Sequence, residues 1–159
     1  MRDGSSDVES LSFTGKQPGS YAKSIHLANI LRPMSQILLV DDNAIQAATR
    51  KAILTRTGRR VLIAESGSVA LRMLAQEEVA TQIALIITDH LMPGMNGPEF
   101  VKRLRETMPE IPVVVLSGLP QAETEYELYD VVFRMKPLLP DALIRLVNEL
   151  LDGSVAQTA

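Results

Sequence analysis

The chain has 159 residues, a net charge of −3 and an apolar content of 46%, which are the size and composition of one ordinary globular domain. The absence of cysteine excludes disulfides, zinc–thiolate sites and thiol catalysis, and two histidines are too few for a multi-histidine metal site. The small acidic excess argues against direct nucleic-acid binding, which needs a surplus of Lys and Arg.

Residues 1–33 are rich in Ser, Gly and Asp, and we predict that they form a largely disordered tail. Residues 34–151 form the predicted folded domain, and 152–159 form a short C-terminal tail. No apolar run approaches the roughly 18 residues that cross a bilayer, and the N-terminus lacks the apolar core of a signal peptide. We therefore expect a cytoplasmic protein that does not insert into membranes.

From residue 36 onward, apolar runs alternate with segments of helical spacing. The runs that predict buried strands are residues 37–40, 61–64, 83–88, 111–116 and 131–135. The segments that predict helices are residues 43–57, 66–77, a stretch starting at Pro98, the weak segment 121–128, and 140–151. In the first helix we assign the apolar face to Ile45, Ala48, Ala52 and Ile53.

Strands that alternate with helices predict an α/β fold with a parallel sheet covered on both faces. In such folds ligands bind at the carboxyl ends of the strands. The predicted strands end in polar residues at these positions: Asp41 and Asp42, Asp89, Ser117, and Lys136.

Three carboxylates at one sheet edge repel one another unless a cation compensates, and oxygen ligands favour Mg²⁺ or Mn²⁺. Lys136 adds a point cation for an anionic ligand. Carboxylates, a metal, a lysine and a hydroxyl together suit phosphoryl transfer, in which a carboxylate can act as the nucleophile.

At this point the chain resembles the response-regulator receiver domain. The motifs that carry the resemblance are residues 37–43 (ILLVDDN), 89–97 (DHLMPGMNG), 115–118 (VLSG) and 136–137 (KP). The resemblance spans about residues 35–151. It implies a doubly wound, flavodoxin-like (βα)5 domain with the strand order 2-1-3-4-5.

The resemblance also implies roles for the acidic residues. Asp89 is expected to accept the phosphoryl group. Asp42 is expected to bind Mg²⁺, or Mn²⁺, directly, and Asp41 to hold it through water. The backbone carbonyl of Leu91 would complete the protein ligands.

Three further roles follow from the same resemblance. Ser117 is expected to donate a hydrogen bond to the phosphoryl oxygens, and Lys136 to form an ion pair with them. Phe133 matches the aromatic switch position, so phosphorylation would move Ser117 toward the new charge and turn Phe133 inward.

The region of the fourth helix departs from the family pattern. The interval between Ser117 and Lys136 is a few residues short, and Pro120 and an acidic run occupy it. We predict a shortened or irregular fourth helix, so the usual output surface is in question. The eight residues after Leu151 are too few for a DNA-binding module, which predicts a stand-alone receiver.

The leading functional hypothesis is a signalling phosphoacceptor of a two-component system or phosphorelay. It would take its phosphoryl group from a histidine kinase or a histidine phosphotransfer protein and signal by protein contact. We do not expect an enzyme: the only reactions expected are its own phosphorylation and dephosphorylation. The alternative is a receiver-fold interaction module that works without phosphorylation.

Two other classes do not match. An Asp-nucleophile phosphatase of the haloacid dehalogenase type has a second Asp two residues after the nucleophile, where this chain has Asn43 or Ala44. A dinucleotide-binding fold needs a Gly-rich turn after the first strand, and none is present.

Overall fold

Five parallel strands form one sheet with the order β2-β1-β3-β4-β5 in the computed structural model, which describes residues 35–153. The strands are β1 (Gln36–Val40), β2 (Arg60–Ala64), β3 (Ile83–Asp89), β4 (Val113–Ser117) and β5 (Val132–Met135). The order and the parallel pairing confirm the predicted doubly wound fold. The predictions for residues 1–33 and 154–159 lie outside the described residues.

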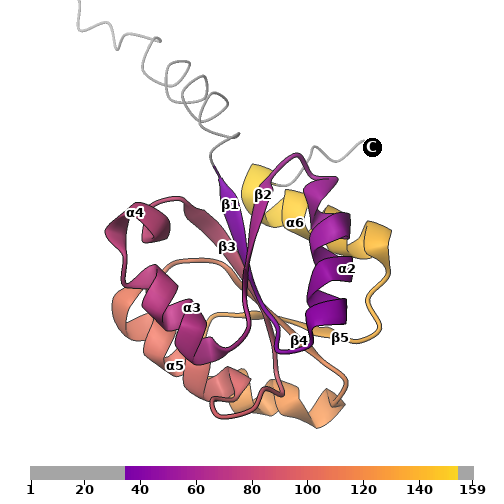
Figure 1. The fold of residues 1–159 in the computed structure, drawn as a ribbon. Coiled ribbons are helices and arrows are strands. Elements are labelled where there is room, and N and C mark those ends of the chain that lie inside the picture. The colour runs from indigo at the N-terminus through magenta and orange to yellow at the C-terminus, as the bar shows by residue number, and fades with distance from the viewer. Residues whose placement is uncertain (1–34, 154–159) are drawn as a thin grey trace, which may run out of the picture. The chain divides into compact units, whose positions relative to one another are not determined.

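Helices cover both faces of the sheet, with α3 and α5 on one face and α2 and α6 on the other (Figure 1). The helical elements are α2 (Ala44–Thr55), α3 (Gly67–Leu74), α4 (Glu77–Ala80), α5 (Gly97–Thr107), the 3₁₀ segment η2 (Pro120–Tyr126) and α6 (Pro140–Asp152). Within residues 35–153, none of these helices has both the length and the apolar character needed to span a bilayer.

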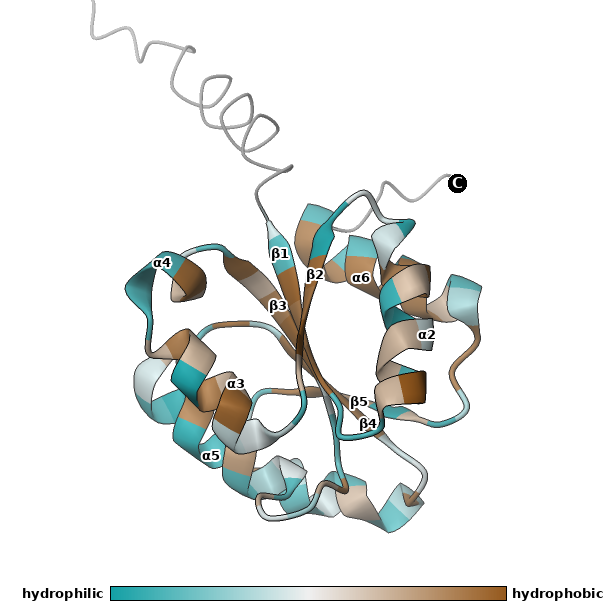
Figure 2. Cartoon of the chain, viewed as in Figure 1, coloured by the Kyte–Doolittle hydropathy of each residue, from teal (hydrophilic) through white to brown (hydrophobic). Residues whose placement is uncertain are grey.

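The three inner strands, β1, β3 and β4, are largely apolar because both faces of the sheet are buried there, whereas the edge strands β2 and β5 are partly exposed (Figure 2). One cluster of buried side chains, centred on Phe100 and Leu104, fills the space beneath α3 and α5. A second cluster, which includes Leu54 and Val147, fills the space beneath α2 and α6. These two layers hold the carboxyl ends of the strands in fixed positions.

Side-chain caps set the starts of three helices. Asn43, Ser66 and Asn96 each accept a hydrogen bond from the backbone N–H three residues ahead, at the beginning of α2, α3 and α5. The predicted helix over residues 66–77 is too long. It ends at Leu74, and the extended backbone of Gln76 separates it from α4.

The apolar face that we assigned to the first helix is correct only at Ile53, which is half-buried against the core beneath α2 and α6; Ala48 and Ala52 are exposed. Ala47 and Leu54 are the buried residues of this helix, whereas Ile45 is 80% exposed. The true inner face runs through residues 47, 50 and 54, and position 50 is an arginine. Because a charged residue interrupts the inner stripe, the sequence pattern favoured the wrong side of the helix.

The fourth helix is reduced to η2, a 3₁₀ segment of seven residues, which confirms the predicted shortening. Ala122 and Tyr126 are buried and attach this segment to the core beneath α3 and α5. A 3₁₀ helix is usually short, which agrees with the short interval between β4 and β5.

Candidate functional site

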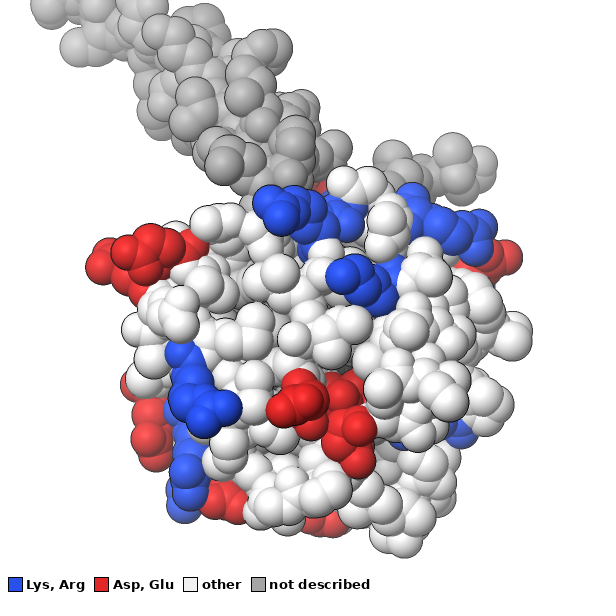
Figure 3. Space-filling view, viewed as in Figure 1, with Lys and Arg blue, Asp and Glu red and all other residues white. Residues whose placement is uncertain are grey.

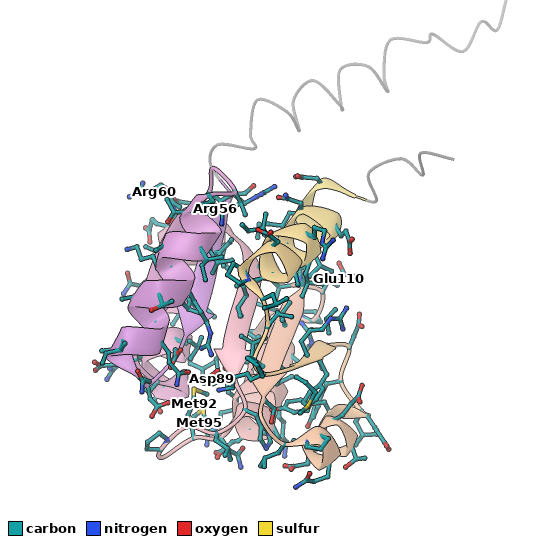
Figure 4. The ribbon with its side chains drawn as sticks, turned by 90° about the vertical axis from the view of Figure 1, so that its right-hand side faces the viewer. Arg56, Arg60, Asp89, Met92, Met95 and Glu110 are labelled. Carbon is teal, nitrogen blue, oxygen red and sulfur yellow. The ribbon has the colours of Figure 1, made fainter. Side chains whose placement is uncertain are left out.

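The register of the sheet brings the predicted site residues together. Val40 pairs with Thr88, so Asp41 at the end of β1 lies beside Asp89 at the end of β3. Asp89 in turn pairs with Leu116, which places Ser117 one residue beyond it on β4. Figure 4 shows Asp89 at the carboxyl end of the sheet.

Three carboxyl groups converge at this edge. Oxygen atoms of Asp41, Asp42 and Asp89 all lie within 4.8 Å of one another. Asp41 and Asp89 are buried, whereas Asp42 is exposed and open to an entering ion. Carboxylate oxygens at this spacing fit a hard divalent cation such as Mg²⁺.

Burial dominates the ionisation of Asp41. Desolvation, with a further contribution from the negative charge of Asp89, raises the pKa of Asp41 from 3.8 to about 6. The backbone N–H of Asn43, which donates to Asp41 Oδ1 over 2.9 Å, and the charge of Arg50 oppose this shift. A bound divalent cation would also stabilise the charged form of Asp41 and so oppose this rise in pKa.

This pKa predicts a pH dependence of stability. Between about pH 4 and pH 6 the folded metal-free protein binds more protons at Asp41 than the unfolded chain, so the free energy of unfolding falls as the pH rises. At about 1.4 kcal/mol for each pKa unit, the fall is at most about 3 kcal/mol. We expect urea unfolding in EDTA to show this fall in the free energy of unfolding for the wild type and not for Asp41→Asn. Parallel stability profiles of the two proteins would contradict the prediction.

Lys136 supplies a cation beside Asp89. Its Nζ lies 3.2 Å from Asp89 Oδ1, and its side chain is about one-third exposed. The backbone N–H of Lys136 donates to the carbonyl of Ser117 over 2.8 Å, which continues the pairing of β4 and β5 beyond the strand ends. The ammonium group is therefore positioned by the sheet itself.

Arg50 is a site residue that the sequence interpretation missed. Its Nη1 donates to Asp41 Oδ2 and, over 3.1 Å, to Asp89 Oδ1. Nη2 donates to Gln46 Oε1 over 3.1 Å, one helical turn earlier. Helical periodicity gave no signal for it, because a charged residue is normally assigned to the solvent side of a helix.

Of the remaining predicted residues, Ser117 and Leu91 lie at the same edge, and Phe133 lies two residues before the end of β5. Ser117 is buried, and its Oγ accepts a hydrogen bond from the backbone N–H of Leu119 over 3.0 Å. Leu91 lies in the loop after β3 with an exposed side chain, and the role of its carbonyl as a metal ligand stays a prediction. Phe133 is half-buried on β5 against the core beneath α3 and α5, and its switch role also stays a prediction.

A buried hydrogen bond links the end of β3 to η2. His90, the residue after Asp89, shares a 2.7 Å hydrogen bond between its Nδ1 and the hydroxyl of Tyr126. The ring of Tyr126 lies 6.1 Å from that of Phe133, and burial raises the pKa of Tyr126 well above its usual range.

Gly97 packs against the hydrogen bond between His90 and Tyr126. A Cβ at position 97 would overlap the Tyr126 hydroxyl and would lie 3.1 Å from the backbone of His90. We expect Gly97→Ala to lower the free energy of unfolding by about 1–3 kcal/mol. In Gly97→Ala/Tyr126→Phe the hydroxyl is gone, so the loss measured by urea unfolding should be smaller than the sum of the two single losses.

Gly118→Ala is the control for this cycle, because a Cβ there meets nothing within 4 Å. Its effect should stay within about 0.5 kcal/mol. Strict additivity of the Gly97 and Tyr126 substitutions would show that the predicted overlap does not occur.

The arginines at the end of α2 do not belong to this site. Arg56 and Arg60 lie at the opposite end of the domain from Asp89 (Figure 4). Arg59 is buried and forms an ion pair with Asp152. In Figure 3 a basic group along the upper edge of the face is separate from an acidic patch lower down. Two exposed arginines and one structural arginine give little support to nucleic-acid binding.

A cavity of about 480 Å³ lies between α2 and the segment that joins β5 to α6. Arg50 and Lys136 both line it, together with apolar side chains that include Ile53 and Leu138. Arg50 and Lys136, the two cations of the site, are therefore both exposed to the same solvent-accessible cavity.

Comparison with known proteins agrees with this geometry. The family model described as the response regulator receiver domain matches residues 37–148. The two-component response regulator ORR6 of Oryza sativa subsp. japonica is 35% identical over 119 residues, which cover 72% of this chain and 69% of ORR6. ORR5 of the same subspecies is 33% identical over 120 residues, covering 72% and 87% of the two chains.

Solved structures show the same fold. A response regulator receiver domain protein from Clostridium thermocellum superposes with a TM-score of 0.67 at 25% identity, covering 74% of this chain and 94% of its own. The signal receiver domain of a histidine kinase from Syntrophus aciditrophicus gives 0.65 at 31% identity, covering 79% and 99%.

The chain belongs to the response-regulator receiver family of two-component signalling. Receiver domains are signalling proteins rather than classical enzymes. They bind Mg²⁺ at an acidic pocket, and the convergence of Asp41, Asp42 and Asp89 is compatible with such a pocket here.

Proposed function

We propose that Asp89 accepts a phosphoryl group from a histidine kinase or a histidine phosphotransfer protein, and that the chain signals by protein contact. The observation that carries the proposal is the position of Lys136 Nζ, 3.2 Å from Oδ1 of Asp89, whose carboxyl group converges with those of Asp41 and Asp42. Phosphoryl transfer depends on this combination of a nucleophile and fixed positive charge. A cytoplasmic location remains part of the proposal.

Each residue has a defined task in the proposed reaction. An Asp89 carboxylate oxygen attacks phosphorus, and the bond between phosphorus and the donor nitrogen breaks. Lys136 neutralises charge on the transferred oxygens, and the Ser117 hydroxyl donates to one of them after leaving Leu119. Asp41, Asp42 and the Leu91 carbonyl would hold Mg²⁺, or Mn²⁺, which supplies further charge neutralisation when bound.

The test is phosphorylation of the full chain by acetyl phosphate, followed by intact-mass spectrometry. We expect a gain of one phosphoryl group in the presence of Mg²⁺ and no gain in EDTA, because the carboxylates then repel the incoming anion. No gain under either condition would favour the interaction module, which the reduced fourth helix also suits.

A further inference from the structure

We propose that Arg50 is an internal counter-ion that competes with the divalent metal for Asp41 and Asp89. The inference rests on the proposed function, because it concerns the metal site used there. The competition predicts that a bound metal displaces the guanidinium group of Arg50. It also predicts that the affinity for the metal is lower than it would be for the three carboxylates without Arg50.

The contacts of Arg50 support direct competition. A single nitrogen, Nη1, bridges Asp41 Oδ2 and Asp89 Oδ1, and so uses one oxygen from each of the two buried carboxylates. A divalent cation at this site needs an oxygen from each of the three carboxyl groups, and one oxygen of each lies within 4.8 Å of the others. The guanidinium and the ion would therefore occupy overlapping space with like charge.

The surroundings also show where the guanidinium would go. Arg50 lines the cavity of about 480 Å³, and Gln46 already accepts a hydrogen bond from its Nη2. The side chain can therefore swing away from Asp89 and remain hydrated. Its helix does not need to move, because rotation about the side-chain bonds is sufficient.

Binding of Mn²⁺, measured by electron paramagnetic resonance of the free ion, tests the competition. In the wild type, Mn²⁺ must displace the two charge-assisted hydrogen bonds that Arg50 donates to Asp41 and Asp89. Arg50→Met lacks these bonds, so we expect it to bind Mn²⁺ about tenfold more tightly, or more. Lys51→Met is the matched control, since it removes the same charge at the next, exposed position of α2. Screening should limit its effect to about twofold.

The outcomes separate the two proposals. Equal Mn²⁺ affinities in Arg50→Met and Lys51→Met would overturn the role of Arg50 and leave the metal site intact. If the wild type and both variants bind no Mn²⁺, the metal site fails, and the proposed phosphoacceptor function and the competition fail with it.

A measurement on the wild type covers the case in which Arg50→Met does not fold. We expect the heteronuclear NOE of Arg50 Nε to fall as Mg²⁺ saturates the site, because the side chain is released. Arg105 is the internal reference, since its guanidinium is held by the carbonyls of Met108, Ile111 and Asp130. An Arg50 side chain that stays as rigid as Arg105 at saturating Mg²⁺ would overturn the inference.

Discussion

Asp89→Asn is expected to abolish phosphoryl uptake completely. The amide has no anionic oxygen to attack phosphorus, and the other two carboxyl groups of the cluster lie at the end of β1 rather than opposite Lys136. The variant should fold, since Asn keeps the shape of Asp at the end of a strand whose neighbours are buried. Intact-mass spectrometry after treatment with acetyl phosphate and Mg²⁺ measures the effect.

Asp141→Asn is the control for this experiment. Asp141 lies in the exposed first turn of α6, with a side-chain exposure of 84%, and its loss also removes one negative charge. The control should take up the phosphoryl group at the wild-type rate. Full uptake by Asp89→Asn would show that another residue is the acceptor.

Lys136→Met should slow phosphoryl uptake about a hundredfold or more, while keeping Asp89 as the acceptor. A fixed cation aimed at developing charge commonly contributes this much to a rate. Methionine retains the apolar stem that lines the cavity, so the loss isolates the ammonium group. The time course of the mass gain, at several concentrations of acetyl phosphate, gives the rate constant.

Lys102→Met, on an exposed position of α5, provides the reference for loss of one positive charge. Its rate should remain within about twofold of the wild type, because salt screens exposed charges. A Lys136→Met rate equal to that of Lys102→Met would mean that the 3.2 Å contact with Asp89 has no part in the transfer.

The sheet and the predicted acceptor region could be inferred from sequence because both depend on short-range patterns. Buried parallel strands are continuous apolar runs, and the polar residue that ends each run must lie at the sheet edge. For this reason Asp41, Asp89 and Ser117 were placed correctly before any tertiary contact was known.

Arg50 shows where that approach fails. Helical periodicity assigns an inner face from apolar residues, and it treats a charged residue as evidence for the solvent side. Here Arg50 lies on the inner stripe between Ala47 and Leu54, because Asp41 and Asp89 compensate its charge. The compensating residues come from two strands, so the pattern of one helix could not reveal them.

The hydrogen bond between His90 and Tyr126 could not be predicted from the sequence either. The two residues are separated by 36 positions, and their contact depends on the exact path of η2. The sequence predicted that this segment would be short and irregular. It contained no information about which of its side chains would turn inward.

The buried position of Tyr126 has a spectroscopic consequence. The chain contains no tryptophan and three tyrosines, so tyrosine dominates its near-ultraviolet absorption and circular dichroism. Tyr126 is held at its hydroxyl by the neighbour of the acceptor and packs beside Phe133. Any rearrangement of either partner changes the asymmetric environment of this one chromophore. The protein therefore contains an intrinsic optical probe at the junction between the proposed acceptor and the shortened fourth helix, and no label is needed.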